Sequence, residues 1–176
     1  YRHGARRFII GLGGSATSDS GTGMLRALDN KWRDIAAHCQ FTLASDVTNP
    51  LYGPNGAAHV FAPQKGATPA MVQQLDDRAR RFAETSSRAL HRDCSDTPGA
   101  GAAGGLGYAF MQYLGATVQS GADLLLTLTR FDDLLPDTLL IITGEGHSDR
   151  QTLMGKLPSR ILAHALPHNI PVWLLS

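Results

Sequence analysis

The chain has 176 residues, of which 43% are hydrophobic and 18% charged, and its formal net charge at pH 7 is +1. This suits one ordinary domain, or a slice across two, with enough apolar side chains for a packed core. The near-neutral charge gives no electrostatic case for binding nucleic acid or an anionic membrane surface. No apolar stretch approaches the roughly 20 residues that a transmembrane helix needs.

Two cysteines, Cys39 and Cys94, stand far apart and match no metal or redox spacing. We therefore expect two free thiols in a reducing cytosol, and hence a cytoplasmic protein. The chain begins at Tyr1 and stops at Ser176, directly after an apolar strand pattern. Because Tyr1 is not an initiator methionine, we expect an internal fragment of a longer protein.

The first predicted elements surround a loop of glycines, hydroxyls and one carboxylate. The apolar run 7–12 predicts a strand and residues 21–29 predict a helix, with the loop between them. Such an arrangement favours an anion at the helix N-terminus, where unpaired backbone N–H groups and the helix dipole converge. A short helical connector over 30–40 and a buried strand over 41–47 follow.

The middle of the chain combines turn signals with one long helix. Residues 58–62 predict a short strand, and Thr68 before a proline predicts the start of a helix over 69–91. We expect the face of this helix that carries Arg and Asp to be solvated. A glycine-rich loop, 99–107, precedes a helix that ends at Gly115 as its C-terminal cap.

The last quarter of the chain predicts a βαβ unit. After an apolar helix over 122–135, residues 139–143 predict a buried parallel strand, 158–166 a helix and 171–175 a final strand. The loop 144–152 therefore follows the carboxyl end of a strand, which is where open α/β sheets bind ligands.

Polar loops between these elements carry a common chemistry. Lysines can neutralise phosphate, carboxylates can hold Mg²⁺ or accept a hydroxyl proton, and glycines allow close approach, which together suit phosphoryl transfer. The candidate catalytic residues are Asp19, Asp46 and Lys65. The candidate substrate- or phosphate-binding residues are Gly13, Gly14, Ser15, Thr17, Asn49, Glu145, Gln151 and Lys156, and the candidate Mg²⁺ ligand is Asp149.

Four of these assignments have structural alternatives. Lys156 is either a phosphate contact or a residue that only closes its loop. Asp19 is either a general base or an N-cap of the following helix. Asp46 is either a base or substrate ligand, or an Asx-turn residue that bonds its own backbone. Lys65 is either a phosphate or carboxylate contact, or a solvated turn lysine.

A dinucleotide site is an alternative interpretation of the first loop. The six residues from Gly11 to Ala16 fit the letters of the G-x-G-x-x-A fingerprint. That fingerprint expects a helix to open inside the glycines, whereas Ser15 to Gly23 extends the loop. An NAD(P)-dependent oxidoreductase and a non-catalytic module that binds small anions therefore stand beside a kinase as hypotheses.

Five motifs together resemble those of the bacterial glycerate kinase family, in the family's order. They are GLGGSATSDSGTGM from Gly11, DVTNPLYGPNGAA from Asp46, FAPQKGAT from Phe61, PGAGAAGGLG from Pro98 and TGEGHSDRQTLMGK from Thr143. In the family, the connector that corresponds to residues 29–40 is longer, and glycine is usual at the position of Ser20.

The resemblance implies ATP-dependent phosphorylation of D-glycerate with Mg²⁺, at the 2-hydroxyl in preference to the 3-hydroxyl, giving 2-phosphoglycerate. It also implies two α/β domains, one of them flavodoxin-like, with the active site in the cleft between them. On this resemblance, residues 1–135 belong to the middle α/β domain. Residues 136–176 belong to the flavodoxin-like domain, which is partly present.

Overall fold

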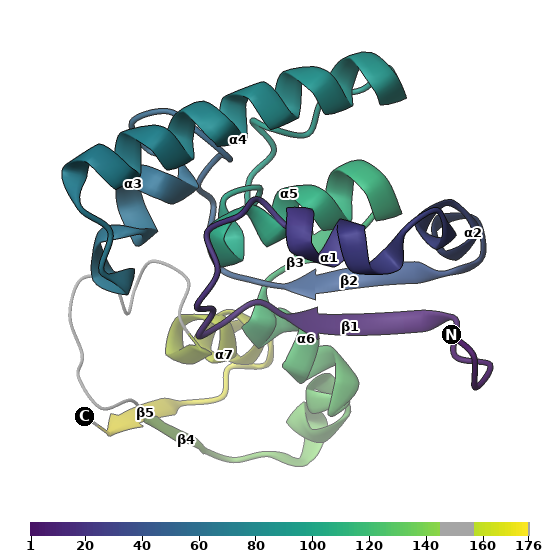
Figure 1. Ribbon diagram of the computed structural model, residues 1–176. Helices are drawn as coiled ribbons and strands as arrows, with labels where there is room; N and C mark the ends of the chain where they lie inside the picture. Colours follow the sequence, from purple (N-terminus) through teal and green to yellow (C-terminus); the bar gives the residue numbers. More distant parts are fainter. Residues whose placement is uncertain (145–156, 176) are drawn as a thin grey trace. The chain divides into compact units, whose positions relative to one another are not determined.

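The computed structural model describes residues 1–144 and 157–175. The chain divides into two compact units, Tyr1–Gln119 and Ser120–Ser176, and parallel strands with helices in each unit confirm the predicted α/β class (Figure 1). The elements of the first unit are β1 (Arg7–Gly11), α1 (Thr22–Leu28), α2 (Lys31–His38), β2 (Gln40–Ala44), α3 (Ala57–Phe61), the 3₁₀ helix η1 (Pro63–Lys65), α4 (Pro69–Leu90), α5 (Ala102–Leu114) and β3 (Thr117–Gln119).

One parallel sheet, in the order β1-β2-β3, supports the first unit. Gly11 of β1 pairs with Ala44 of β2, so the loops after these strands leave the same edge of the sheet. In Figure 1, β1 and β2 lie side by side with α1, α4 and α5 above them. The strand β3 was not predicted, because three residues are too few to show a strand's alternation.

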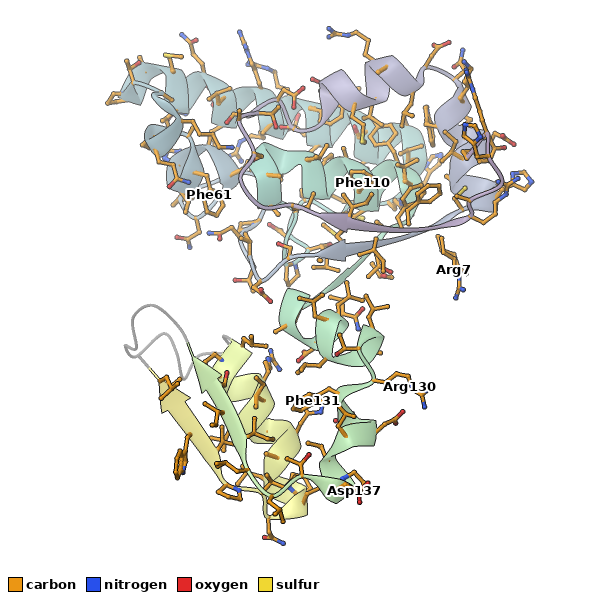
Figure 2. The ribbon with its side chains drawn as sticks, turned by 90° about the horizontal axis from the view of Figure 1, so that it is seen from below. Arg7, Phe61, Phe110, Arg130, Phe131 and Asp137 are labelled. Atoms are coloured by element: carbon orange, nitrogen blue, oxygen red, sulfur yellow. The ribbon has the colours of Figure 1, made fainter. Side chains whose placement is uncertain are left out.

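The core of the first unit lies between the sheet and α5. Phe41 and Leu43 of β2 are buried, and Phe8 of β1 packs against them. The ring centroid of Phe41 lies 5.1 Å from that of Phe8 and 5.7 Å from that of Phe110 on α5, which Figure 2 labels. This apolar layer fixes the ends of the strands from which the polar loops emerge.

Residues 57–61 form the helix α3, so the prediction of a strand over 58–62 was wrong. Ala57 and Ala58 are buried, and Ala58 packs with Ala62 and Val72 in a small apolar cluster. Alanine is the strongest helix former, and an apolar run this short has no periodicity that distinguishes a strand from a buried helix.

The helix α4 begins as predicted, but one of its charged residues is buried. The hydroxyl of Thr68 accepts a hydrogen bond from the Met71 amide at 3.3 Å and caps the helix. Asp76 is only 3% exposed, and its carboxylate accepts a hydrogen bond from the Gly53 amide at 2.7 Å. The expectation of a wholly solvated charged face was therefore wrong, since Asp76 ties the turn after β2 to α4.

The glycine-rich segment 99–107 is a packing surface. Its second half is wound into α5, where Ala103, Gly104 and Gly105 all have positive φ. A Cβ on Gly104 would lie 2.1 Å from the Thr17 carbonyl oxygen, and one on Gly105 would lie 2.7 Å from the Ser20 Cα. These glycines let the loop after β1 lie directly on α5.

The second unit contains a βαβ motif. Its elements are α6 (Gly121–Leu128), the 3₁₀ helix η2 (Phe131–Asp137), β4 (Ile141–Gly144), α7 (Leu157–Ala165), the 3₁₀ helix η4 (Leu166–His168) and β5 (Val172–Leu175). The strands β4 and β5 are parallel, as predicted. Among the residues described, no helix is both long and apolar enough to span a membrane.

The two compact units divide between Gln119 and Ser120. Residues 120–135 lie in the second unit because of packing: Leu135 forms a cluster with Ala165 and Ile170, and Phe131, labelled in Figure 2, packs against it. The domain boundary after residue 135, which the family resemblance implies, stays a prediction.

Replacing Gly107 with alanine tests the close packing of α5. The new Cβ would lie 2.2 Å from the Gly99 carbonyl oxygen, so we expect Gly107→Ala to lower the free energy of unfolding by about 1–3 kcal/mol. Urea denaturation measures this loss. The control is Gly11→Ala, whose Cβ would meet no atom within 4 Å and which should change stability by less than about 0.5 kcal/mol. Equal stabilities of the two variants would contradict the packing argument.

Candidate functional site

The loop between β1 and α1 forms one wall of the candidate site. It leaves the sheet at Gly11 and reaches the first residue of α1 at Thr22. Gly13 and Gly14 are exposed, and Gly14 has a φ of 65°, a conformation that glycine adopts without strain. Backbone groups of this part of the loop are therefore accessible to a ligand.

Asp19 binds the N-terminus of α1. Its Oδ1 accepts a hydrogen bond from the Gly21 amide at 3.0 Å, and its Oδ2 accepts one from the Gly23 amide at 2.8 Å. A carboxylate satisfies helix N–H groups that otherwise lack partners and is favourable near the positive end of the helix dipole. The capping interpretation of Asp19 therefore has a direct geometric basis, and the side chain still lines a cavity, described below.

Lys65 connects two segments that lie 50 residues apart in sequence. Its Nζ donates hydrogen bonds to the Ser15 hydroxyl at 3.1 Å and to the Thr17 carbonyl at 2.6 Å. The turn that carries it closes at Gly66, which has a φ of 92°. Burial lowers the pKa of the Lys65 ammonium, because a less hydrated site disfavours its charged form. The first loop therefore holds the Lys65 ammonium in place through two hydrogen bonds.

Two cavities of the first unit share Lys65 as part of their lining. The larger has a volume of about 470 Å³ and is lined by Ala16, Ser18, Asp19, Lys65, Arg78 and Phe82 among others. The smaller has a volume of about 210 Å³ and is lined by Gly13, Gly14, Ser15, Val47, Gln64 and Lys65 among others. The predicted residues of the first loop and Lys65 are thus brought together.

The helix α4 supplies a wall of the larger cavity that the sequence analysis did not assign to the site. Met71, Leu75, Arg78 and Phe82 all line it. Their spacing of four, three and four residues places them on one face of a helix. That spacing was the available signal, because it puts one arginine in a row of apolar residues, where a solvated cation is not expected.

Asp46 and Asn49 line neither cavity. The Asn49 side-chain amide donates a hydrogen bond to the Asn55 carbonyl at 2.8 Å and holds the turn after β2. Asp46 is exposed and follows β2 at the same level of the sheet as Gly13 follows β1. Its neighbour Val47 lines the smaller cavity, so Asp46 lies near the glycines although it is not part of the cavity wall.

Four predicted site residues, Glu145, Asp149, Gln151 and Lys156, lie outside the described residues. Their roles stay predictions. Within 1–144 and 157–175, no group of three or more His, Cys, Asp or Glu side chains is arranged to hold a metal ion. The described part of the site is therefore a surface of backbone amides, hydroxyls, cations and separate carboxylates.

Known proteins resemble this chain along nearly its whole length. It is 40% identical over 195 residues to glycerate 2-kinase of Escherichia coli, an alignment that covers 96% of this chain and 51% of that protein. It is 47% identical over 178 residues to an uncharacterized protein of Mycobacterium bovis, and this alignment covers 99% of this chain and 46% of that protein. A crystal structure from Salmonella typhimurium LT2, assigned to glycerate kinase 2, matches with a TM-score of 0.84 at 38% identity. The match covers 98% of this chain and 54% of that one.

The alignments with these relatives differ in length. The E. coli alignment spans 195 positions, more than the whole of this chain, so that protein has residues that this chain lacks. The M. bovis alignment spans 178 positions, so the matched part of that protein has nearly the same length as this chain. The model of the glycerate kinase family matches in two overlapping segments, which puts the interruption at residues 29–37. This interruption lies within the connector that the sequence analysis expects to be short.

The chain spans about half the length of the curated relatives it matches. The family model matches residues 1–37 and 29–176, which together include every residue of the sequence. Both the motifs and the fold agree with this match. The chain belongs to the glycerate kinase family.

Proposed function

We propose that this chain forms part of an ATP-dependent kinase that transfers the γ-phosphoryl group of ATP to the 2-hydroxyl of D-glycerate, giving 2-phosphoglycerate. The observation that carries the proposal is the Lys65 ammonium, held by Ser15 and Thr17 at the junction of two cavities. Family membership supports glycerate as the acceptor, and the E. coli relative's name, glycerate 2-kinase, supports the 2-position.

Phosphoryl transfer needs positioning and charge neutralisation more than covalent chemistry. An ammonium has three N–H donors, and two of those of Lys65 are used by the first loop. These bonds hold the cation in place, so it does not have to reorganise as negative charge moves between the two reacting oxygens. We assign to Lys65 the neutralisation of the transferred phosphoryl group.

The proton of the attacking hydroxyl needs an acceptor, and two carboxylates are available. Asp19 is held by the amides of Gly21 and Gly23, so its main role is to fix the loop. Asp46 is exposed beside the segment that lines the smaller cavity. We assign the general base to Asp46 and a positioning role to Asp19, with glycerate bound against Gly13, Gly14 and Ser15.

The family resemblance also implies Mg²⁺, which when bound would neutralise charge on the phosphate oxygens. Mg²⁺ is commonly held by one or two carboxylates together with the substrate's phosphates and water. That mode does not require the three-residue cluster that is absent from the described residues. We assign Asp149 as its protein ligand, in agreement with the chemistry of that side chain. Asp149 lies outside the described residues.

The geometry of the first loop does not favour the alternative of a dinucleotide-binding enzyme. In the dinucleotide fingerprint the glycines open directly into a helix, whose N-terminus faces the pyrophosphate. Here α1 begins at Thr22, well after Gly13 and Gly14, and its first amides are taken by Asp19. The non-catalytic alternative, a module that binds small anions, uses the same cation and is separated from the kinase by activity alone.

The test uses the native protein that contains this chain, with D-glycerate, ATP and Mg²⁺. Product formation is coupled to enolase without a mutase, so that a signal reports 2-phosphoglycerate. A signal that appears only after mutase is added would identify the 3-phosphorylated product and overturn the 2-position. Absence of glycerate-dependent ADP release in both assays would overturn the kinase proposal.

Substitution of Lys65 should reduce turnover. We expect Lys65→Met to lower kcat by about 100-fold or more, since loss of a preorganised charge at a transition state costs about 2.7–4 kcal/mol in comparable sites. Lys31→Met is the matched control, because Lys31 lies on the exposed start of α2. Circular dichroism checks that both variants fold. Wild-type kcat in a folded Lys65→Met enzyme would refute its role.

The two carboxylates should respond differently to conversion into amides. Asp46→Asn removes the proposed base and should lower kcat by about 10²–10⁴-fold. Asp19→Asn weakens the interaction with α1, and we expect it to lower the free energy of unfolding by about 0.3–1 kcal/mol with a smaller effect on kcat. The opposite pattern, measured by steady-state kinetics and thermal melts, would transfer the base to Asp19.

Nicotinamide cofactors should not bind. We expect saturating NAD(H) or NADP(H) to leave the melting temperature of the native protein unchanged, whereas ATP with Mg²⁺ should raise it by mass action. Differential scanning fluorimetry measures both. A rise in melting temperature with NAD(H) alone would revive the dinucleotide interpretation of the first loop.

A further inference from the structure

We infer that the larger cavity binds the nucleotide, with Arg78 on its phosphates and the α4 wall against its base, while the smaller cavity takes the acid. This inference rests on the proposed function and names the part of the site that each substrate occupies. It also adds Arg78, a residue to which no motif pointed, as a determinant of nucleotide affinity.

The two cavities differ in size by more than a factor of two. Their volumes are about 470 Å³ and about 210 Å³. Sites for drug-sized ligands have volumes of about 300–1,000 Å³, so the larger cavity suits a nucleoside phosphate. The smaller one suits a three-carbon acid, whose carboxylate and hydroxyls can be bound by the backbone of Gly13 and Gly14 and the side chains of Ser15 and Gln64.

The larger cavity has an excess of positive charge. Its charged lining consists of Lys65, Arg78 and Asp19, so two cations face one carboxylate. The carboxylate is already bound to the amides of α1. Arg78 has neither a hydrogen bond nor an ion pair with any residue of the described ranges 1–144 and 157–175. A guanidinium has five N–H donors in a planar fork that matches phosphate, and here the whole fork is available to a ligand.

The remaining wall of the larger cavity is apolar and partly rigid. Met71 and Leu75 supply flexible aliphatic surface, and Phe82 supplies a ring. That ring is stacked on Tyr113 at a centroid distance of 6.0 Å and meets Tyr108 edge to face at 5.7 Å. A fixed aromatic ring is a surface against which a planar base packs well, and the thioether of Met71 lines the same cavity about three helical turns away. Glycerate has no group that would use it.

Lys65 lies where the two cavities meet and lines both. A phosphoryl group that passes from nucleotide to acid must cross from one ligand to the other within reach of the same stabilising charge. Lys65 therefore lies between the phosphoryl donor, in the cavity lined by Arg78, and the phosphoryl acceptor, in the cavity lined by Gly13 and Gly14.

The first test compares two arginines of α4. We expect Arg78→Met to raise the Kd for ATP and ADP by about tenfold to a hundredfold, because charge-assisted hydrogen bonds are lost, and to leave the Kd for adenosine and the KM for glycerate within about twofold. Arg81→Met is the control, because Arg81 is exposed on the same helix and does not line the cavity. Titration calorimetry on the native protein measures each Kd.

A second variant fills the larger cavity without altering charge. Met71 is 48% exposed on its wall, so Met71→Trp can be accommodated without disturbing the core. We expect Met71→Trp to raise the Kd for ATP and the Kd for adenosine by about tenfold or more, and to leave the KM for glycerate within about twofold.

The outcomes separate this inference from the proposed function. If the native protein phosphorylates glycerate but Arg78→Met binds ATP normally, the assignment of the cavity is overturned and the kinase stands. If Arg78→Met or Met71→Trp weakens the binding of glycerate instead of ATP, the larger cavity holds the acid, and the inference is likewise overturned. If ATP binds in the predicted manner without glycerate turnover, the cavity assignment is supported and the proposed acceptor fails.

Discussion

The candidate site depends on the close approach of the loop after β1 to the glycines of α5. The Ser20 amide donates a hydrogen bond to the Gly104 carbonyl at 2.9 Å, and a Cβ at Gly104 or Gly105 would overlap the backbone of the loop. This contact fixes residues 17–20, and with them the Thr17 carbonyl that accepts from Lys65. The absence of two side chains in α5 therefore sets the position of a cation about 40 residues earlier in the chain.

The helix α4, which forms the other wall of the larger cavity, is also held in place by a buried contact. Asp76 faces inward and holds the Gly53 amide, and Arg80 lies 3.6 Å from its carboxylate and over the ring of Tyr52. Loss of a buried hydrogen-bonding partner costs about 1–3 kcal/mol, so this face of the helix is anchored to the turn after β2. Arg78, two residues from Asp76, is left to face the larger cavity. One helix thus serves both the fold and the proposed nucleotide wall.

Local sequence signals predicted much of this and failed where the decisive contacts are distant. The Thr68 cap, the C-terminal Gly115 and the βαβ unit follow from short-range rules, and Lys65 was a candidate because a lysine in a polar loop can neutralise phosphate. The helix at 57–61 and the burial of Asp76 depend on packing across more than ten residues, which no local pattern contains. The glycine-rich loop 99–107 did not reveal its packing role, because close approach to a ligand and close approach to another backbone need the same residue.

Lys65 links the stability of the empty site to the binding of an anion. Burial lowers the pKa of its ammonium, so the fold disfavours the charged form relative to the unfolded chain. This cost is present while Lys65 is protonated and disappears as the pH rises past its ordinary pKa of about 10.4. A phosphate beside the ammonium favours the charged form and so opposes the effect of burial on this pKa. The strain of holding this cation in a partly dry position is therefore relieved by the kind of ligand that the site is proposed to bind.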